Sequence, residues 1–469
     1  MVATGRCVKN ASAPTSQSSC GYGTSCRAVV AARRIGFGLV ACIALIGCGK
    51  QSPPAPVGGT GSTGTTGGTA SQTGTPPATS GTVGTPATPT TPVKGAPVSQ
   101  ADVDELAKKL MTALGNDDPT AATQLFDWDG LIDMAAASAA NDPGIPAERI
   151  AELVSEFRKS VISSRQKSGG AFGQWRQLVR SGAIPKIVWA TAAGGVEPSI
   201  LIRIMHTNSG VSYLEMFVGR ASDSRICVSD ILAWENGERT SSAFRRAFNT
   251  LIASPQGLGA NAKLKDVSND YAIIGKMAAL SGARRFAEVL QLSKSLSPGF
   301  QNDRVVLVLR MTAASNAENI GELQAAVAAV RKNFPNDTTF DLALLDPHLT
   351  LEQYDLAVGC LERLEKRASQ DGYIKTLSGN ILYAAKRYDE SRKKLLEAIE
   401  MEPDLVAPYQ ALMSVALAQN DFKELRRMLE VQTEKFGTEW ADLTKVPEYA
   451  DFVKSDEYRE WKAGSTKSE

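Results

Sequence analysis

Apolar positions between residues 98 and 255 follow a helical period first. A helix is predicted behind Ser99, a residue type that caps helices, with Val103, Leu106, Leu110 and Leu114 on one face. The same spacing predicts three further helices, over 118–132, which includes Phe126, over 146–161 behind Pro146, and around 175–178.

The period then changes to two, which predicts strands. Alternation begins at Ile187 and returns over 200–205, 211–218 and 226–234, with Asn208-Ser209-Gly210 and Asn236-Gly237 as turns. An amphipathic helix follows, around Phe244 to Leu251. Helices followed by a meander of antiparallel strands indicate an α+β domain over 98–255, with helices packed on one face of an antiparallel sheet.

This order of elements, ending in the strand ICVSDILAWENGE, resembles the nuclear transport factor 2-like (cystatin-like) fold. The resemblance implies a pocket, and some members of that fold are enzymes. Candidate pocket residues would be His206, Asp230 and Tyr213. The alternative, which we favour, is a hydrogen-bonded turn histidine and strand aspartate, because no second base or metal-ligand cluster accompanies them.

Bulky residues recur at a fixed interval in the second half of the chain. Each gap is 34 residues, and the positions are Phe286, Ile320, Tyr354, Tyr388 and Phe422. A constant period of this length predicts stacked helical hairpins, an all-α solenoid over 270–465.

The clearest copy runs from 372 to 405. It contains Gly379, Leu382, Tyr388, Leu395, Ala398 and Pro403. These positions resemble the tetratricopeptide repeat, in which a small residue lets two helices approach and a proline marks the end of the second. Ser391 departs from that pattern by replacing the usual alanine, and Met413 by replacing a small residue. A capping helix is expected over 446–461.

The resemblance also implies a concave groove lined by the first helix of each hairpin. The partner-binding residues we expect there are Tyr373, Thr376, Asn380, Tyr383, Gln410 and Ser414. The alternative is a solenoid that acts as a spacer and whose groove binds nothing specific.

The beginning of the chain has the layout of a secretory signal. A basic stretch ends at Arg33-Arg34, and an apolar run follows from Ile35 to Ile46, too short for the roughly 20 residues that a membrane-spanning helix needs. The run ends in Leu45-Ile46-Gly47-Cys48, which resembles the bacterial lipobox. That resemblance implies that 1–47 is a lipoprotein signal peptide and that Cys48 becomes a lipidated N-terminus. An uncleaved anchor, or an ordinary signal with a chance cysteine, is the alternative.

Residues 48–97 are predicted to form a flexible tether. From 51 onward they are built from small and turn-forming residues, with Lys94 as the only charge. Such a segment cannot bury enough apolar surface to order itself, so we expect a disordered Gly/Thr/Pro linker. Gly49 rather than aspartate follows the cysteine, which favours the periplasmic face of the outer membrane over retention at the inner membrane.

The composition excludes some classes of ligand. The chain carries a net charge of +1, but the first 47 residues hold five basic residues and no acid, so the remainder holds 46 basic and 50 acidic residues. No basic excess remains for nucleic acid. Only two histidines and two cysteines beyond Cys48 are present, too few for a typical zinc site, and we expect no cofactor.

The sequence therefore predicts an exported, lipid-anchored scaffold that binds a protein or peptide partner in the cell envelope and is not an enzyme. A small-molecule or enzymatic pocket in the α+β domain is the second hypothesis, and a purely structural spacer is the third.

Overall fold

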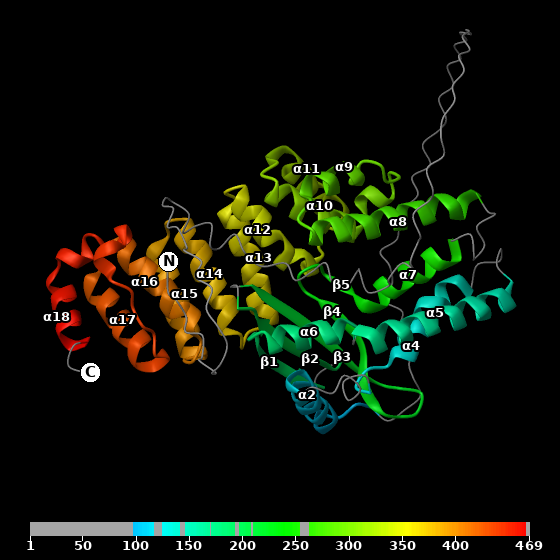
Figure 1. Cartoon of the computed structure of the whole chain (residues 1–469), viewed down its shortest axis with the longest axis horizontal. Helices are drawn as coiled ribbons and strands as arrows, with labels where there is room; N and C mark the ends of the chain where they lie inside the picture. The colour runs from blue at the N-terminus through cyan, green and yellow to red at the C-terminus, as the bar shows by residue number, and fades with distance from the viewer. Residues whose placement is uncertain are drawn as a thin grey trace, which may run out of the picture.

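The computed structural model describes residues 97–116, 124–140, 146–168, 170–192, 197–207, 210–253 and 262–465. The expected signal peptide, Cys48 and the linker up to residue 96 lie outside these residues. Within them, a five-stranded sheet is flanked by helices, and a long row of paired helices continues from it (Figure 1).

The helical pattern at the start of the α+β domain is confirmed. The helices are α2 (Gln100–Gly115), α4 (Trp128–Ala140), α5 (Ala147–Ser168) and α6 (Gly170–Arg180). Ser99 caps α2 in a reciprocal arrangement, because its hydroxyl accepts from Asp102 N while the Asp102 carboxylate accepts from Ser99 N. The predicted apolar face of α2 is buried.

Phe126 does not belong to a helix, contrary to the expectation for 118–132. It forms an isolated parallel bridge with Val228 of β4, in which Val228 N donates to Leu125 O at 2.8 Å and Asp127 N donates to Val228 O at 2.9 Å. The backbone here is satisfied by a strand far away in sequence, and helical periodicity cannot reveal such pairing. The expected helix start at Asp118-Pro119 lies outside the described residues.

The strands form an antiparallel meander in the order β1-β2-β3-β4-β5. Their bounds are β1 (Ile184–Thr191), β2 (Ser199–Met205), β3 (Val211–Arg220), β4 (Ile226–Ala233) and β5 (Glu238–Arg239), and α7 (Thr240–Ala253) follows. The predicted strands and the helix after them are thus present.

Both faces of this sheet are buried. Ile200, Ile202 and Ile204 share a core with α2 and α6, as expected for helices packed on one face. Residues of alternate parity, such as Leu201 and Tyr213, belong instead to the core of the paired helices. The α+β domain and the first part of the solenoid therefore share one continuous core.

The second half of the chain is a run of paired helices. They are α8 (Ala262–Gly282), α9 (Phe286–Ser293), α10 (Arg304–Asn316), α11 (Ile320–Asn333), α12 (Asp341–Thr350), α13 (Tyr354–Arg367), α14 (Gly372–Ala384), α15 (Tyr388–Met401), α16 (Val406–Gln419) and α17 (Phe422–Phe436). Short 3₁₀ turns lie at Phe300–Asn302 (η2) and Thr338–Phe340 (η3). The first helix of the row begins at Ala262, ahead of the expected start at 270.

The end of the chain differs from the single capping helix expected over 446–461. Three 3₁₀ turns, η4 (Leu443–Lys445), η5 (Pro447–Tyr449) and η6 (Phe452–Lys454), precede α18 (Asp456–Ser465). The chain turns at Ser455, whose hydroxyl accepts from Tyr458 N at 3.2 Å and so caps α18. Tyr449 and Phe452 from the turns still cover the last helix pair, so the segment serves as a cap in a different form.

The 34-residue period has one structural meaning throughout. Each of the five periodic bulky residues is the first residue of the second helix in its pair. Two positions earlier, Arg284, Glu318, Glu352, Lys386 and Asn420 have φ angles of 58°, 53°, 55°, 61° and 55°. The same left-handed turn thus joins the helices of every pair, which confirms a repeat architecture.

Candidate partner-binding site

The expected partner-binding residues lie on α14 and α16, the first helices of two successive pairs, which contact each other. They divide into two groups. Tyr373 and Thr376, at the start of α14, are buried within the chain. Asn380, Tyr383, Gln410 and Ser414 are half-buried. The two buried residues could meet a partner only after a rearrangement.

The sheet covers the first turn of α14. Arg203 of β2 forms an ion pair with Asp371, and its guanidinium carbon lies 5.6 Å from the centre of the Tyr373 ring. Asp371 also caps α14 by accepting from Tyr373 N at 2.8 Å. Thr376 is satisfied internally, because its hydroxyl donates to Gly372 O at 2.8 Å.

Glu402, just beyond α15, completes this contact. Arg203 reaches its carboxylate with both terminal nitrogens, at 3.0 and 2.9 Å, and Lys186 Nζ lies 2.7 Å away. Gly372 N donates to the same carboxylate at 2.8 Å. Burial alone would raise the pKa of Glu402, but the hydrogen bonds and charge of Arg203 and the bond from Lys186 outweigh it and lower the pKa to about 2.

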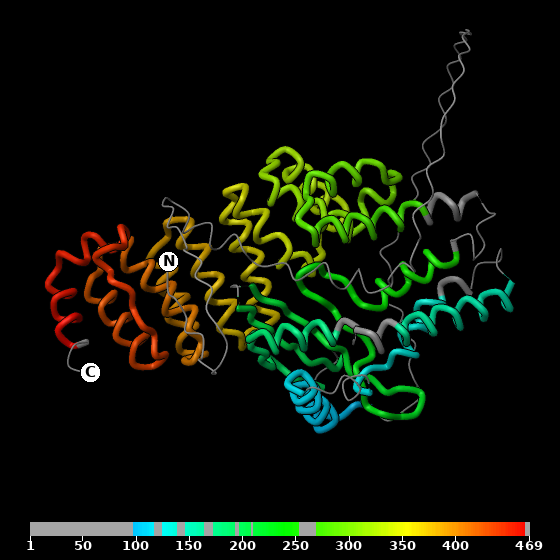
Figure 2. Tube along the Cα trace, in the orientation of Figure 1, coloured from blue at the N-terminus to red at the C-terminus, as the bar shows by residue number. Residues whose placement is uncertain are grey.

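A second contact holds the sheet against α13. Arg367, at the end of α13, pairs with Glu215 of β3, and its guanidinium carbon lies 4.7 Å from the centre of the Trp234 ring. Trp234 Nε1 donates to Glu215 at 2.9 Å. Figure 2 shows the strands against the earlier part of the helix row, while α16 to α18 extend beyond them.

Equivalent positions in successive repeats differ in exposure along the helix row. One and two periods before Asn380 stand Asp346 of α12 and Thr312 of α10, and both are buried. Asn380 and its successor Ser414 are half-buried. At this repeat position the first helices are therefore buried at α10 and α12 and accessible at α14 and α16.

Two amides stand out on that accessible face. Within the described residues, the side chains of Asn380 and Gln410 make no hydrogen bond, whereas the backbone oxygen of Gln410 accepts from Ser414 Oγ at 3.5 Å. The Tyr383 ring lies beside Tyr388, with centroids 5.7 Å apart. The face offers paired donors and acceptors next to an aromatic surface.

Asp230 and Tyr213, two of the residues considered for a pocket in the α+β domain, have separate side-chain contacts. Asp230 accepts from Ser241 N at 3.0 Å and from Ser241 Oγ at 2.6 Å, at the start of α7. Tyr213 is fully buried and stacks on Trp234, with centroids 5.3 Å apart. Burial, followed by the charge of Asp371, raises the pKa of the Tyr213 hydroxyl well above its usual value.

His206 belongs to a small network at the end of β2. Its Nε2 lies 3.1 Å from Ser212 Oγ, and burial lowers the pKa of the imidazole. Glu235 also bonds to Ser212 and accepts from Tyr213 N at 3.0 Å. Burial raises the pKa of Glu235 to about 7. Sequence reasoning missed Glu235. The residue follows the apolar strand β4 and belongs to no periodic pattern, so nothing in the sequence marks it as buried.

Sequence reasoning also missed Arg203, although a signal was present. It stands between Ile202 and Ile204 in a strand whose neighbours on both sides are apolar. An arginine in such a strand marks either an exposed face or a buried charge that needs a partner. Here it is 3% exposed.

Comparison with known proteins gave no match to a family model, a curated protein or a solved structure. None of the described helices is both long enough and apolar enough to cross a membrane.

Proposed function

We propose that this protein is a lipid-anchored scaffold of the cell envelope that binds a protein or peptide through the face formed by α14 and α16. The observation that carries the proposal is the change in exposure along the repeats. Equivalent positions are buried at Thr312 and Asp346 but half-buried at Asn380 and Ser414. The paired helices and their 34-residue period support a tetratricopeptide-like stack, an architecture suited to extended binding faces.

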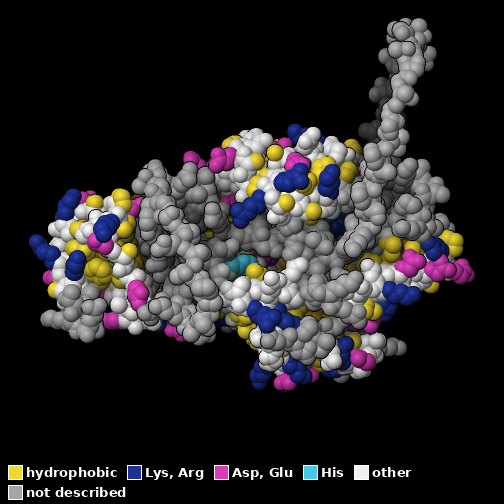
Figure 3. All heavy atoms as spheres, viewed as in Figure 1, with side chains coloured by type: hydrophobic (Ala, Val, Ile, Leu, Met, Phe, Trp, Pro, Cys, Tyr) yellow, Lys and Arg dark blue, Asp and Glu magenta, His cyan; other side chains and the backbone are white. Residues whose placement is uncertain are grey.

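The chemistry of this face suits a polypeptide. A primary amide donates and accepts hydrogen bonds as a peptide backbone does, so Asn380 and Gln410 can pair with an extended segment. Tyr383 adds a rigid aromatic surface that loses little conformational entropy on binding. On the side of the molecule drawn in Figure 3, basic side chains are interspersed with acidic ones, in keeping with a protein partner rather than nucleic acid.

The anchor is the second part of the proposal. It is supported by the short apolar run ending at Cys48 and by the tether-like composition of 51–97. Replacing Cys48 with serine should release the chain from membranes and remove the acyl mass from the mature N-terminal peptide. An unmodified Cys48 in the wild-type protein would refute the anchor without affecting the binding face.

The binding face is tested by photocrosslinking in cells. A photoreactive residue at position 380 or 410 should yield the same discrete adduct, and one at exposed Lys393 on α15 should not. Asn380→Asp combined with Gln410→Glu should weaken binding of the adduct protein, identified by mass spectrometry, to the purified chain. Adducts equal at all three positions, or unchanged affinity of the double variant, would refute the proposal.

A further inference from the structure

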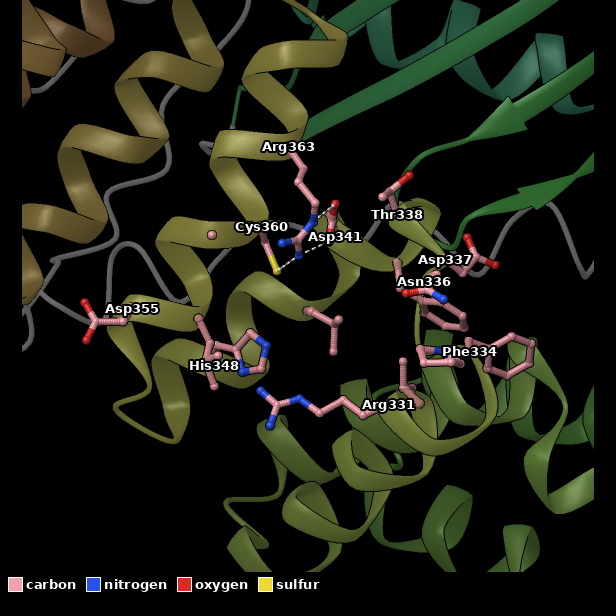
Figure 4. Close-up of a pocket in the computed structure, with 16 residues that line it drawn as sticks. Arg331, Phe334, Asn336, Asp337, Thr338, Asp341, His348, Asp355, Cys360 and Arg363 are labelled. Carbon is pink, nitrogen blue, oxygen red and sulfur yellow. Dashed lines mark hydrogen bonds and ion pairs between the residues drawn. The ribbon is translucent and has the colours of Figure 1, made fainter.

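A cavity separate from the α14/α16 face opens between α11, α12 and α13 (Figure 4). Its volume is about 430 Å³, within the range of small-ligand sites. Apolar side chains form much of its wall, namely those of Val330, Phe334, Phe340, Leu344 and Leu356. Leu356 is 43% exposed, so part of this apolar wall faces solvent.

The acidic groups around this cavity are already neutralised. Asp341 accepts from Arg363 Nε at 2.9 Å and from Arg363 Nη2 at 2.6 Å. Asp337 is paired with Arg304, and Asp355 lies 3.1 Å from Arg387. Burial raises the pKa of the Cys360 thiol to about 12, so this group is uncharged at neutral pH.

Arg331 is the exception among these charges. It is exposed at the end of α11 and has no ion pair or hydrogen bond with any residue that the structure describes. Figure 4 shows its guanidinium beside the ring of His348, below the Arg363–Asp341 pair. One uncompensated positive charge therefore stands at a largely apolar cavity, an arrangement that favours an anionic ligand.

His348 supplies the second polar group. The residue is 2% exposed, and its Nδ1 lies 3.0 Å from Gln353 Oε1. With Nδ1 donating to that oxygen, Nε2 is left as the atom that can bond to a ligand. Burial is the main cause that lowers the pKa of the imidazole, and the charges of Arg331 and Arg363 also lower it. The hydrogen bond with Gln353 and the charge of Asp341 oppose this shift without reversing it, so the neutral ring is favoured without ligand.

We propose that this cavity binds a carboxylate carried on an apolar group, either a free organic acid or the C-terminal residue of a peptide. Arg331 pairs with the carboxylate, and the apolar group packs against Phe334, Leu344 and Leu356. A bound anion favours the charged imidazole, so His348 takes up a proton and donates from Nε2 to the carboxylate. Binding should therefore strengthen as the pH falls from 8 to 6.

The test uses the full chain and calorimetric titration of N-acetylleucine, with N-acetylleucinamide as the uncharged control. We expect binding of the acid alone, stronger at pH 6 than at pH 8, with proton uptake visible as a dependence of the heat on buffer ionisation. The affinity of a short peptide ending in leucine is then compared with that of N-acetylleucine, which shows whether a peptide terminus is preferred over the free acid. The C-terminal amide of the peptide is its uncharged control.

Arg331→Met should weaken binding of the acid by at least about tenfold, because a charge-assisted pair is lost. Arg331→Lys should fall between it and the wild type, because it keeps the charge but not the planar fork. Arg285→Met, which removes an exposed arginine paired with Glu288, is the matched control. Equal binding of acid and amide, no binding of either acid or peptide, or full affinity in Arg331→Met would overturn the proposal.

Discussion

Arg203 Nη2 lies 2.9 Å from Glu402 Oε2, joining the middle of β2 to the end of α15 across 199 residues of sequence. The same arginine pairs with Asp371 at the start of α14. Since both carboxylates belong to the loops that connect successive helix pairs, this contact fixes the sheet to the edge of the solenoid. The accessible face on α14 and α16 begins where this contact ends.

Replacing Arg203 with methionine should destabilise the protein by about 3–5 kcal/mol. The substitution leaves Asp371 without its cation in a buried site, and Glu402 with only Lys186, and uncompensated buried charges are costly. The free energy of unfolding from urea titration, monitored by circular dichroism, measures the loss. Arg285→Met breaks an exposed ion pair and should change it by less than about 1 kcal/mol. Equal effects of the two substitutions would contradict a structural role for the Arg203 contact.

The repeats could be predicted from sequence because their signal is local. One bulky residue begins the second helix of each pair, so the spacing of Phe286, Ile320 and their successors directly gives the stack. The contact of Arg203 with Asp371 and Glu402 has no such signal, since its partners are 168 and 199 residues away. The nearly continuous apolar sequence of β2 shows that both faces of the strand are apolar, but it does not show which elements cover them.

The same difference between local and long-range signals explains why the candidate binding residues were only partly predicted. Helical spacing places Tyr373, Thr376, Asn380 and Tyr383 on one face of α14, and the sequence predicts the same exposure for all four. The structure separates them, because Tyr373 and Thr376 are buried, Tyr373 beside Arg203 of the sheet, whereas the other two are half-buried. Helical periodicity gives the face on which a residue lies but cannot show what another part of the fold places over it.

Glu235 should make stability depend on pH in the direction opposite to that of a paired carboxylate. Burial raises its folded-state pKa from 4.5 to about 7, so between these values the folded protein binds more protons than the unfolded chain. Stability should therefore fall as pH rises from about 5 to 7 and then level off, with this residue contributing on the order of 3 kcal/mol.

Glu235→Gln isolates that contribution. The amide oxygen can still accept from Tyr213 N, so the variant should match the wild type near pH 5 and exceed it in stability at pH 8. Urea titrations at both pH values measure the difference. If the two proteins lose stability in parallel between pH 5 and pH 8, the buried carboxylate is not the group responsible.

Gly379 should not tolerate even a methyl group. A Cβ at this position would lie 2.6 Å from Leu395 Cδ2 and Cγ and 3.3 Å from Ser391 O, where α14 packs against α15. We expect Gly379→Ala to cost about 1–3 kcal/mol by overpacking. Gly275→Ala in α8 has open space around the added atom and should instead stabilise by about 0.5–1 kcal/mol. Thermal unfolding of the two variants should give shifts of opposite sign, and a shared sign would contradict the packing argument.

The left-handed turns that join the paired helices predict a gain of stability from glycine. Glu352 and Lys386 have φ angles of 55° and 61°, which place Cβ too close to the following carbonyl oxygen in an L-residue. Both are exposed, so removing either side chain sacrifices no buried contact. Glu352→Gly and Lys386→Gly should each stabilise by up to about 1 kcal/mol, since relief of strain exceeds the entropic cost of glycine. Glu362→Gly, at an exposed position inside α13, should destabilise by about 1 kcal/mol. Chemical denaturation of the three variants distinguishes the effects, and destabilisation by all three would show that these turns are not strained.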